Sequence, residues 1–127
     1  GILSALQVSY WRDGIVLAQH TLSVIGPNSG TLNNLGNALA HQNRLDEAIS
    51  KYEEALRFQP DYADCWNNLG NAMFKKGMMG QAIDNYKRAL ILEPLHIKAH
   101  FNLAYAYQHT GRTQAALNSL ALGKVRT

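Results

Sequence analysis

Apolar and small residues recur along this chain at the spacing of an amphipathic helix. Between residues 29 and 58 they form two successive runs, Leu32-Leu35-Gly36-Leu39 and Ala48-Ile49-Tyr52-Ala55-Leu56. A period near 3.6 residues places each run on one face of a helix. We therefore predict two helices, separated near Asn43, because asparagine tolerates the left-handed backbone that often follows a helix.

The same pattern returns in the next segment of the chain. Residues 29–62 laid over residues 63–96 give 12 identities in 34 positions, including the hexapeptide NNLGNA at 33–38 and 67–72. Pro60 and Pro94 close the second run of each copy, and Gly77 and Gly111 stand where Asn43 does. Proline ends helices, so we predict repeated helical hairpins at 29–62 and 63–96. A truncated third copy is expected at 97–127.

A degenerate copy is expected before residue 29. Shifted back by one repeat, Ala48-Ile49 and Ala55-Leu56 fall on Gly14-Ile15 and Thr21-Leu22. Residues 12–25 are accordingly predicted as the second helix of a repeat that spans 1–28, with residues 2–11 as a short first helix. The expected organisation is a single domain of about three and a half repeats over residues 1–127.

The repeated residues resemble the tetratricopeptide repeat, a 34-residue helical hairpin. The matching positions in the second copy are Trp66, Leu69, Gly70, Met73, Gly77, Ala82, Tyr86, Ala89 and Pro94. The resemblance implies an all-α fold, a right-handed superhelix of antiparallel helix pairs forming an alpha-alpha solenoid. In such arrays the hairpins stack, and the first helix of each pair lines a concave groove.

Residues on the first helices that do not face the stack are expected to face this groove. Six such positions are Asn33, His41, Asp64, Asn67, Lys75 and His109. The candidate peptide-binding residues are a further nine: Asn34, Asn37, Asn68, Asn71, Asn102, Lys98, Phe74, Phe101 and Tyr105.

The predicted binding function depends mainly on a row of asparagine residues. Asn34, Asn68 and Asn102 share one register, although asparagine is a middling-to-poor helix former. A carboxamide has one acceptor and two donors, so it can pair with both the C=O and the N–H of one peptide unit. We expect the row to bind the backbone of an extended protein segment. The alternative is that these side chains bond neighbouring helices or face water.

Aromatic residues beside the asparagines are expected to provide anchor pockets. Phe74, Phe101 and Tyr105 could each receive a side chain of the bound segment. Packing of Phe74 and Tyr105 between adjacent repeats is an equal alternative.

The asparagine row is similar to the asparagine ladder in the superhelix of O-GlcNAc-transferase-like proteins, which clamps a substrate or partner backbone. That resemblance carries to Asn34, Asn68 and Asn102. It implies an alternative function, the substrate-recruiting arm of a glycosyltransferase, which could be membrane-tethered. A carboxylate clamp of the chaperone-binding kind is not expected, because two of its basic positions are asparagine and little charge is left to hold a free carboxylate.

The run Tyr10-Trp11-Arg12-Asp13 is similar to multi-span membrane proteins that carry an extracytoplasmic tetratricopeptide tail. This resemblance implies that the chain could be a piece of such a protein. The compartment is otherwise taken as cytoplasmic by default.

Composition narrows the classes of partner. Hydrophobic residues make up 46% of the chain and charged residues 17%, which is typical of a globular protein. The net charge of +3 is scattered rather than concentrated, so we expect no nucleic-acid partner. No apolar run reaches the roughly 18 residues of a membrane span, so direct membrane contact is not expected either. The expected partner is a protein or peptide.

Candidate chemistry is sparse. Cys65 is the one cysteine and is interpreted as a small buried residue rather than a nucleophile. His96 and His100 are spaced i, i+4, but no Asp, Glu or Cys lies at ligand spacing, so neither a metal site nor another cofactor is predicted. His100 takes the position of Trp66 in the repeat, so a packing role is predicted for it. The absence of a nucleophile–base pair or phosphate loop predicts a non-catalytic protein.

The last predicted helix, residues 113–125, would expose Leu117, Leu120 and Leu122. Natural arrays finish with a polar capping helix. In isolation this end is therefore expected to dimerise, to borrow a neighbouring molecule in a crystal, or to fray, so a homo-oligomer through this helix is one of three expected outcomes.

Overall fold

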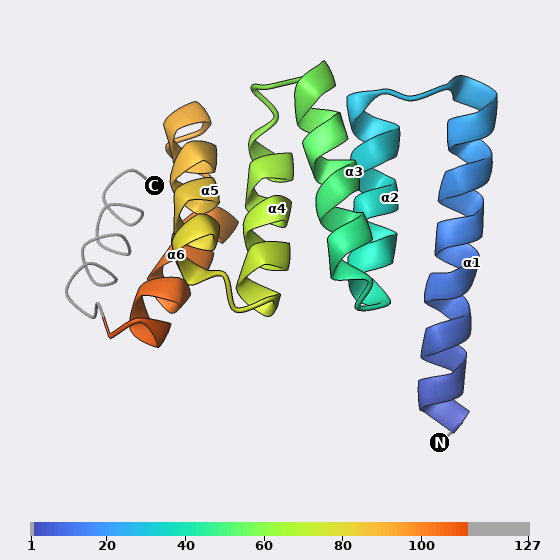
Figure 1. The fold of residues 1–127 in the computed structure, drawn as a ribbon, viewed down its shortest axis with the longest axis horizontal. Helices are drawn as coiled ribbons and strands as arrows, with labels where there is room; N and C mark the ends of the chain where they lie inside the picture. The colour runs from blue at the N-terminus through green and yellow to red at the C-terminus, as the bar shows by residue number, and fades with distance from the viewer. Residues whose placement is uncertain (1, 112–127) are drawn as a thin grey trace. The chain divides into compact units, whose positions relative to one another are not determined.

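The structure is a computed structural model that describes residues 2–111, with side chains from residue 12 onward. Within that range the chain is all-α and contains no strand: the helices are α1 (Ile2–Ile25), α2 (Ser29–His41), α3 (Leu45–Phe58), α4 (Ala63–Lys75), α5 (Met79–Leu92) and α6 (Ile97–His109). They fall into two compact units, residues 1–60 with α1 to α3 and residues 61–127 with α4 to α6. Figure 1 labels each helix.

The predicted turn residues have the expected backbone conformation. Asn43, Gly77 and Gly111 have φ values of 60°, 81° and 77°, the left-handed region in which glycine and asparagine are tolerated. They follow α2, α4 and α6. Helices α3 and α5 each end shortly before Pro60 or Pro94, as a residue without an N–H and with a restricted predecessor requires. The sequence prediction of these helix ends is confirmed.

Side chains cap the first turns of two helices. Asn28 accepts a hydrogen bond from the Thr31 N–H at 2.9 Å, and the Thr31 hydroxyl accepts from the Asn28 N–H at 3.1 Å. This reciprocal capping box satisfies N–H groups that have no partner inside α2. His96 caps α6 in a related way, because its Nδ1 accepts from the Ala99 N–H at 3.1 Å.

The predicted break after Trp11 is wrong. Residues 2–25 form one continuous helix, α1, rather than a hairpin of two short helices. The position equivalent to Asn43 and Gly77 is Ser9, which has no preference for the left-handed backbone. This segment contains no proline. Its one glycine, Gly14, destabilises the helix by only about 1 kcal/mol relative to alanine. The other repeat boundaries stay a prediction. Helices α2 and α3 lie within the predicted repeat 29–62, and α4 and α5 lie within the predicted repeat 63–96.

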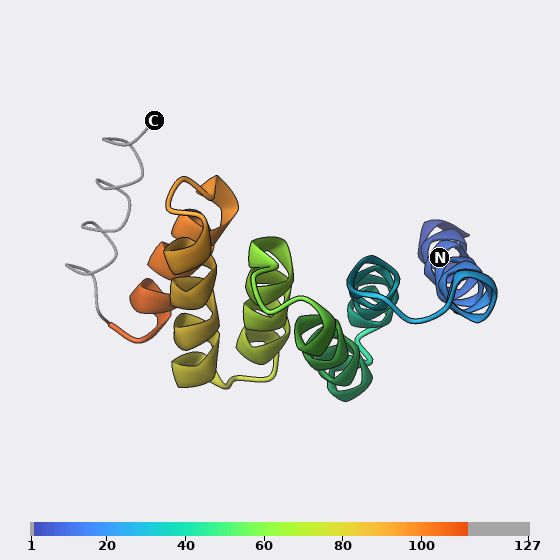
Figure 2. The same cartoon turned by 90° about the horizontal axis from the view of Figure 1, so that it is seen from above.

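In the first unit, α2 and α3 run antiparallel and side by side (Figures 1 and 2). Leu32, Leu35 and Leu39 are buried on α2, and Ala48, Ile49, Tyr52, Ala55 and Leu56 are buried on α3. These are the residues of the two periodic runs. Helix α1 packs on α2, and Ile15 is its buried apolar residue among those with described side chains.

A glycine allows each hairpin to close around a tyrosine ring. A Cβ added to Gly36 would lie 2.6 Å from Cε1 of Tyr52, and one added to Gly70 would lie 2.6 Å from Cε1 of Tyr86. Real Cβ atoms do not approach a ring so closely. Each tyrosine is only 2% exposed, so the ring has no free direction in which to move.

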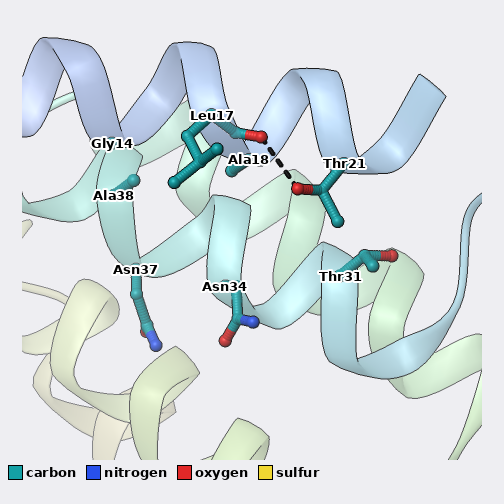
Figure 3. A pocket seen from close by; sticks show the side chains of 8 residues that line it. All are labelled: Gly14, Leu17, Ala18, Thr21, Thr31, Asn34, Asn37 and Ala38. Carbon is teal, nitrogen blue, oxygen red and sulfur yellow. Dashed lines mark hydrogen bonds between the residues drawn. The ribbon is translucent and has the colours of Figure 1, made fainter. Parts of the chain in front are cut away.

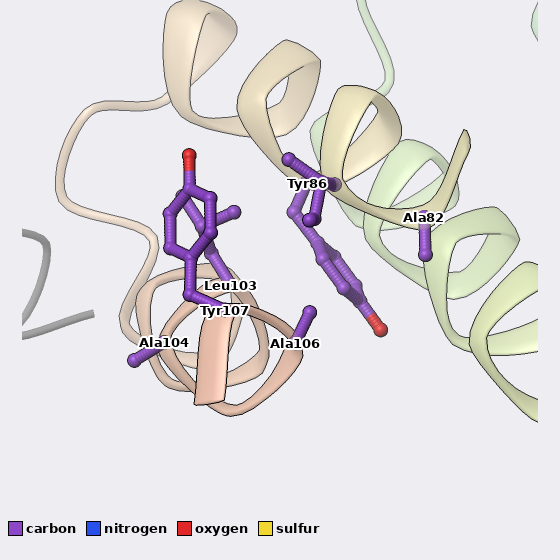
Figure 4. Close-up of a cluster of buried hydrophobic side chains, with 7 residues drawn as sticks. Ala82, Tyr86, Leu103, Ala104, Ala106 and Tyr107 are labelled. Carbon is purple, nitrogen blue, oxygen red and sulfur yellow. The ribbon is translucent and has the colours of Figure 1, made fainter. Parts of the chain in front are cut away.

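The second unit adds α6 to its hairpin. Tyr86 belongs to a buried cluster that joins α5 to α6, drawn in Figure 4; its members are Ala82, Ile83, Tyr86, Leu103, Ala104, Ala106 and Tyr107. Burial of His100 on α6 agrees with the predicted packing role, since its Nε2 lies 2.9 Å from the Pro94 carbonyl oxygen.

Two predictions concern residues that the structure does not describe. The predicted last helix, with Leu117, Leu120 and Leu122, lies outside the described residues, and so does the oligomer expected through it. Among the helices that are described, none is both long and apolar enough to cross a membrane.

Candidate peptide-binding surface

Each first helix presents one exposed or half-buried stripe of side chains. On α4 the stripe contains Asn68 and Asn71, and on α6 it contains Asn102 and Tyr105, with Lys75 and Lys98 exposed beyond them. Helix α2 repeats the pattern in the first unit with Asn34, which is exposed, and Asn37, which is half-buried. The predicted asparagine register thus lies at the surface of all three helices.

We call the stripe of the second unit the amide–aromatic surface. It consists of Asn68, Asn71 and Phe74 of α4 with Lys98, Phe101, Asn102, Tyr105 and His109 of α6.

Two of the nine candidates hold the tyrosines of the hairpins. The Tyr52 hydroxyl donates to Oδ1 of Asn37 at 2.7 Å, and the Tyr86 hydroxyl donates to Oδ1 of Asn71 at 2.7 Å. Burial raises the pKa of Tyr86 above its usual range, because removal from water disfavours the phenolate. The phenol therefore stays a hydrogen-bond donor, and Asn37 and Asn71 have a structural role whatever else they bind.

Asn102 reaches across to α4. Its Nδ2 donates to Oδ1 of Asn67 at 3.0 Å. Asn67 itself is 4% exposed and Asn33 is 5% exposed, so the prediction that both face a groove is wrong. One position along a helix is about 100° of rotation, which turns Asn67 from the stripe of Asn68 toward α6.

Three aromatic rings lie together where the amide–aromatic surface reaches the C-terminal ends of α4 and α6. Phe74 lies 5.4 Å from Tyr105 and 5.1 Å from His109 between ring centroids, and Tyr105 lies 4.9 Å from His109. These distances and tilted geometries are those of favourable aromatic pairs. Phe74 is half-buried against the α5–α6 cluster while Tyr105 remains 54% exposed. Phe74 and Tyr105 thus pack against each other between α4 and α6, as the packing alternative expects, and their role as an anchor pocket stays a prediction.

His109 joins this cluster without having been among the nine candidates. Its position one helical turn after Tyr105, on the same face of α6, is the signal that could have selected it. Phe101, by contrast, is 61% exposed one turn before Tyr105 and adds an apolar ring at the surface.

Asp64, Glu93 and His96 lie together near the start of α6. Their ligand atoms lie within 4.8 Å of one another, so two carboxylates lie beside His96 that the sequence did not predict to lie there. Asp64 comes from the preceding repeat, so its closeness to His96 in space is not revealed by spacing along the sequence.

The hydrogen bonds of His96 disfavour a metal there. Because Nδ1 accepts from the Ala99 N–H, the ring proton lies on Nε2 and is donated to Oδ1 of Asp64 at 2.6 Å. A metal bound to Nε2 would move that proton to Nδ1 and break the helix cap. The trio is accordingly interpreted as a link between the first turns of α4 and α6.

Cys65 is fully buried on α4. Burial, with a smaller contribution from Asp64, raises the pKa of its thiol from 9.0 to about 12. The thiol should therefore stay protonated at pH 8, with about 1,000-fold less thiolate than an unperturbed cysteine.

We expect the folded chain to react with a disulfide reagent such as DTNB at pH 8 far more slowly than the chain unfolded in guanidinium chloride. The raised pKa also means that this group favours folding below pH 9 and that its contribution is lost between pH 9 and about 12. Equal labelling rates in the two states would contradict the burial of Cys65.

The first unit contains a pocket between α1 and α2, shown in Figure 3. Its volume is about 280 Å³. Ala18 and Thr21 of α1 line one wall, and Ala38 of α2 lines the other, with Asn34 and Asn37 at the edge. Two of the nine candidate residues thus border a pocket that the sequence did not predict.

Family comparisons match the repeated segments directly. A model described as TPR repeat matches residues 36–77, and models described as tetratricopeptide repeat match residues 63–95 and 85–118. Together they run from residue 36 to residue 118, across five of the described helices. The chain belongs to the tetratricopeptide repeat family. Its fold is the all-α TPR solenoid that the period of the sequence predicts.

Solved structures with the same fold include several of MamA. A "Crystal structure of MamA" has a TM-score of 0.81 at 21% identity, with 89% of this chain and 66% of that chain covered. "MamA AMB-1" has a TM-score of 0.73 at 26% identity over 89% of this chain and 66% of that chain. "MamA MSR-1" has a TM-score of 0.76 at 24% identity over 94% and 68%.

The chain spans 66% and 62% of the length of the first two MamA chains. No curated protein matches the sequence. The TPR repeats support a protein-interaction scaffold, a fold that is typically non-catalytic.

Proposed function

We propose that this TPR chain binds an extended segment of a partner protein, with the amide–aromatic surface as its main contact. The observation that carries the proposal is the pairing of surface carboxamides with an exposed aromatic cluster on α4 and α6. Asn68 and Asn102 supply amides for the backbone of the segment, and the rings of Phe74, Tyr105 and His109 supply an apolar contact for one of its side chains.

Carboxamides suit a backbone ligand because the group has two donors and an acceptor and can pair with both the N–H and the C=O of one peptide unit. Asn102 uses one donor for Asn67, which fixes its orientation and leaves its acceptor and second donor for a ligand. A side chain held in place loses less entropy on binding. The surface is therefore partly organised in advance.

The aromatic cluster suits an anchor side chain. Tyr105 and Phe101 are more than half exposed, whereas Phe74 is half-buried and provides a rigid base under Tyr105. Aromatic residues dominate the binding energy of many interfaces. Lys75 is exposed directly after Phe74, so an acidic residue near the anchor would be favoured over a basic one.

The double variant Asn68→Ala/Asn102→Ala tests the amide contribution. Peptides selected from a displayed library against the wild-type chain would be titrated by fluorescence polarisation. Two lost amide pairs at about 1 kcal/mol each correspond to about 30-fold weaker binding.

The matched control is Gln81→Ala/Asn85→Ala, which removes two carboxamides from α5 and should leave the affinity unchanged. Circular dichroism would confirm that both double variants fold. Unchanged binding by a folded Asn68→Ala/Asn102→Ala chain would rule out the asparagine row as the contact.

The glycosyltransferase arm remains a prediction from the sequence. No contact among residues 12–111 favours it over a scaffold.

A further inference from the structure

The α1–α2 pocket lies beside a position at which the other repeats carry a large side chain. Ala18 stands one repeat before Tyr52 and two repeats before Tyr86, in the same register. In α3 and α5 that position carries a buried tyrosine. In α1 it carries a methyl group, and the pocket opens beside it.

The second unit shows what fills the equivalent space. Tyr86 shares a buried cluster with Ala106 of α6, and Figure 4 shows its ring beside that alanine. Ala38 is the residue of α2 that corresponds to Ala106, two repeats earlier. The pair Ala18 and Ala38 therefore lines, in the first unit, the place that corresponds to the side of the Tyr86 ring that meets α6, whereas the other side of that ring lies against Gly70 of α4.

The size of the pocket fits one side chain. At about 280 Å³ it lies just below the roughly 300–1,000 Å³ of pockets that hold whole small ligands. Its lining includes the apolar side chains of Leu17, Ala18 and Ala38, so a large part of the wall is apolar. A single ring entering from outside would recover the contacts that Tyr86 makes from within.

The edge of the pocket is polar. Asn34 and Asn37 of α2 border the pocket, and in Figure 3 their carboxamides extend from α2 on the side away from α1. Asn37 already accepts the Tyr52 hydroxyl through Oδ1, which leaves its two amide donors. The Thr21 hydroxyl donates to the Leu17 carbonyl oxygen at 3.0 Å and keeps its acceptor lone pairs. A phenol hydroxyl at this edge would find both donors and acceptors.

We propose that the α1–α2 pocket binds one tyrosine side chain of a partner protein's segment, with Asn34 at its edge bound to the backbone of that segment. Tyrosine is favoured over phenylalanine because the edge can bond its hydroxyl, as Asn37 and Asn71 bond the internal tyrosines. The proposal rests on the proposed function, since it assumes a protein ligand, and it specifies which side chain the first unit selects.

The direct test is a titration of the wild-type chain with three capped peptides, acetyl-Gly-Tyr-Gly-amide and its Phe and Ala counterparts, followed by ¹H–¹⁵N NMR. We expect the Tyr peptide to shift the amides of Ala18, Thr21, Thr31 and Ala38 and to bind at least ten times tighter than the Ala peptide. The Phe peptide should bind with intermediate affinity. Equal shifts with all three peptides, or none at millimolar concentration, would overturn the proposal without the use of any variant.

Two variants of α1 sharpen the result. Ala18→Tyr supplies the missing ring from within and should abolish the shifts caused by the Tyr peptide. Gln19→Tyr adds the same ring at the next, exposed position and should leave them unchanged. If both variants bind the Tyr peptide like the wild type, the pocket is not its site.

The proposed function and the pocket proposal can be tested independently of each other. Asn68→Ala/Asn102→Ala alters the second unit and should leave the Tyr-peptide shifts in the first unit intact. Loss of library-peptide binding with unchanged Tyr-peptide shifts supports both proposals, whereas absent Tyr-peptide shifts sink only the pocket. If sedimentation shows self-association that Ala18→Tyr abolishes, the ring comes from a second copy of the chain and a separate partner is excluded.

Discussion

Replacement of Gly70 by alanine is expected to lower the free energy of unfolding by about 2 kcal/mol. The new Cβ would lie 2.6 Å from Cε1 and 2.7 Å from Cδ1 of Tyr86. The ring is 2% exposed and its hydroxyl is bonded to Asn71, so it cannot withdraw. Overpacking of this kind costs about 3 kcal/mol, and the better helix propensity of alanine offsets about 1 kcal/mol. Urea unfolding followed by circular dichroism measures the difference.

Gly80 provides the matched control for that substitution. It also lies in a helix of the second unit, but a Cβ there would meet nothing within 4 Å. Gly80→Ala should therefore raise the stability by about 0.5–1 kcal/mol, through reduced entropy of the unfolded chain and better helix propensity. Opposite signs for the two substitutions identify the tyrosine ring as the cause. If Gly70→Ala were as stable as the wild type, the result would contradict the close contact between Gly70 of α4 and the Tyr86 ring of α5.

Removal of the ring itself should have a larger effect. Tyr86→Ala is expected to destabilise the chain by about 3–5 kcal/mol, the usual cost of deleting a buried aromatic side chain. Tyr86 touches Gly70 and Asn71 of α4 and belongs to the cluster shared with α6, so three helices lose a common contact. Denaturant unfolding gives the magnitude, and hydrogen exchange should show lost protection in α4 as well as in α5.

Tyr86→Phe separates the hydroxyl from the ring. It keeps the packing and removes one hydrogen bond to Asn71, so we expect a loss of only about 1 kcal/mol. In the Tyr86→Ala background, Gly70→Ala should cost nothing, because the added methyl group then has space. A Tyr86→Ala chain no less stable than Tyr86→Phe, or additive effects of the two alanines, would contradict the contact.

Much of the fold follows from the sequence because its signals are local and repeated. The helix periodicity, Pro60, Pro94 and the residues with positive φ each act within a few positions, and the repeat states them more than once. The register of Asn34, Asn68 and Asn102 at the helix surface follows from the same geometry.

The features that the sequence could not supply depend on contacts between helices. Ser9 in place of a turn residue is a weak signal, so the continuous α1 was missed. The burial of Asn67 depends on the angle at which α6 crosses α4. Asp64 pairs with His96 although the two residues are about one repeat apart in the sequence. The hydrogen bonds from the tyrosine hydroxyls to Asn37 and Asn71 depend on the exact position of each ring between its helices.

The close fit of glycine and tyrosine leaves a record of covariation inside this single chain. The two positions keep a constant spacing, and the four copies read Ile2 with Ala18, Gly36 with Tyr52, Gly70 with Tyr86, and Ala104 with Leu120. At this pair of positions glycine occurs only where tyrosine does, and both are lost together. An exchange of sequence between copies would therefore have to move both positions together to keep the fit of ring and glycine.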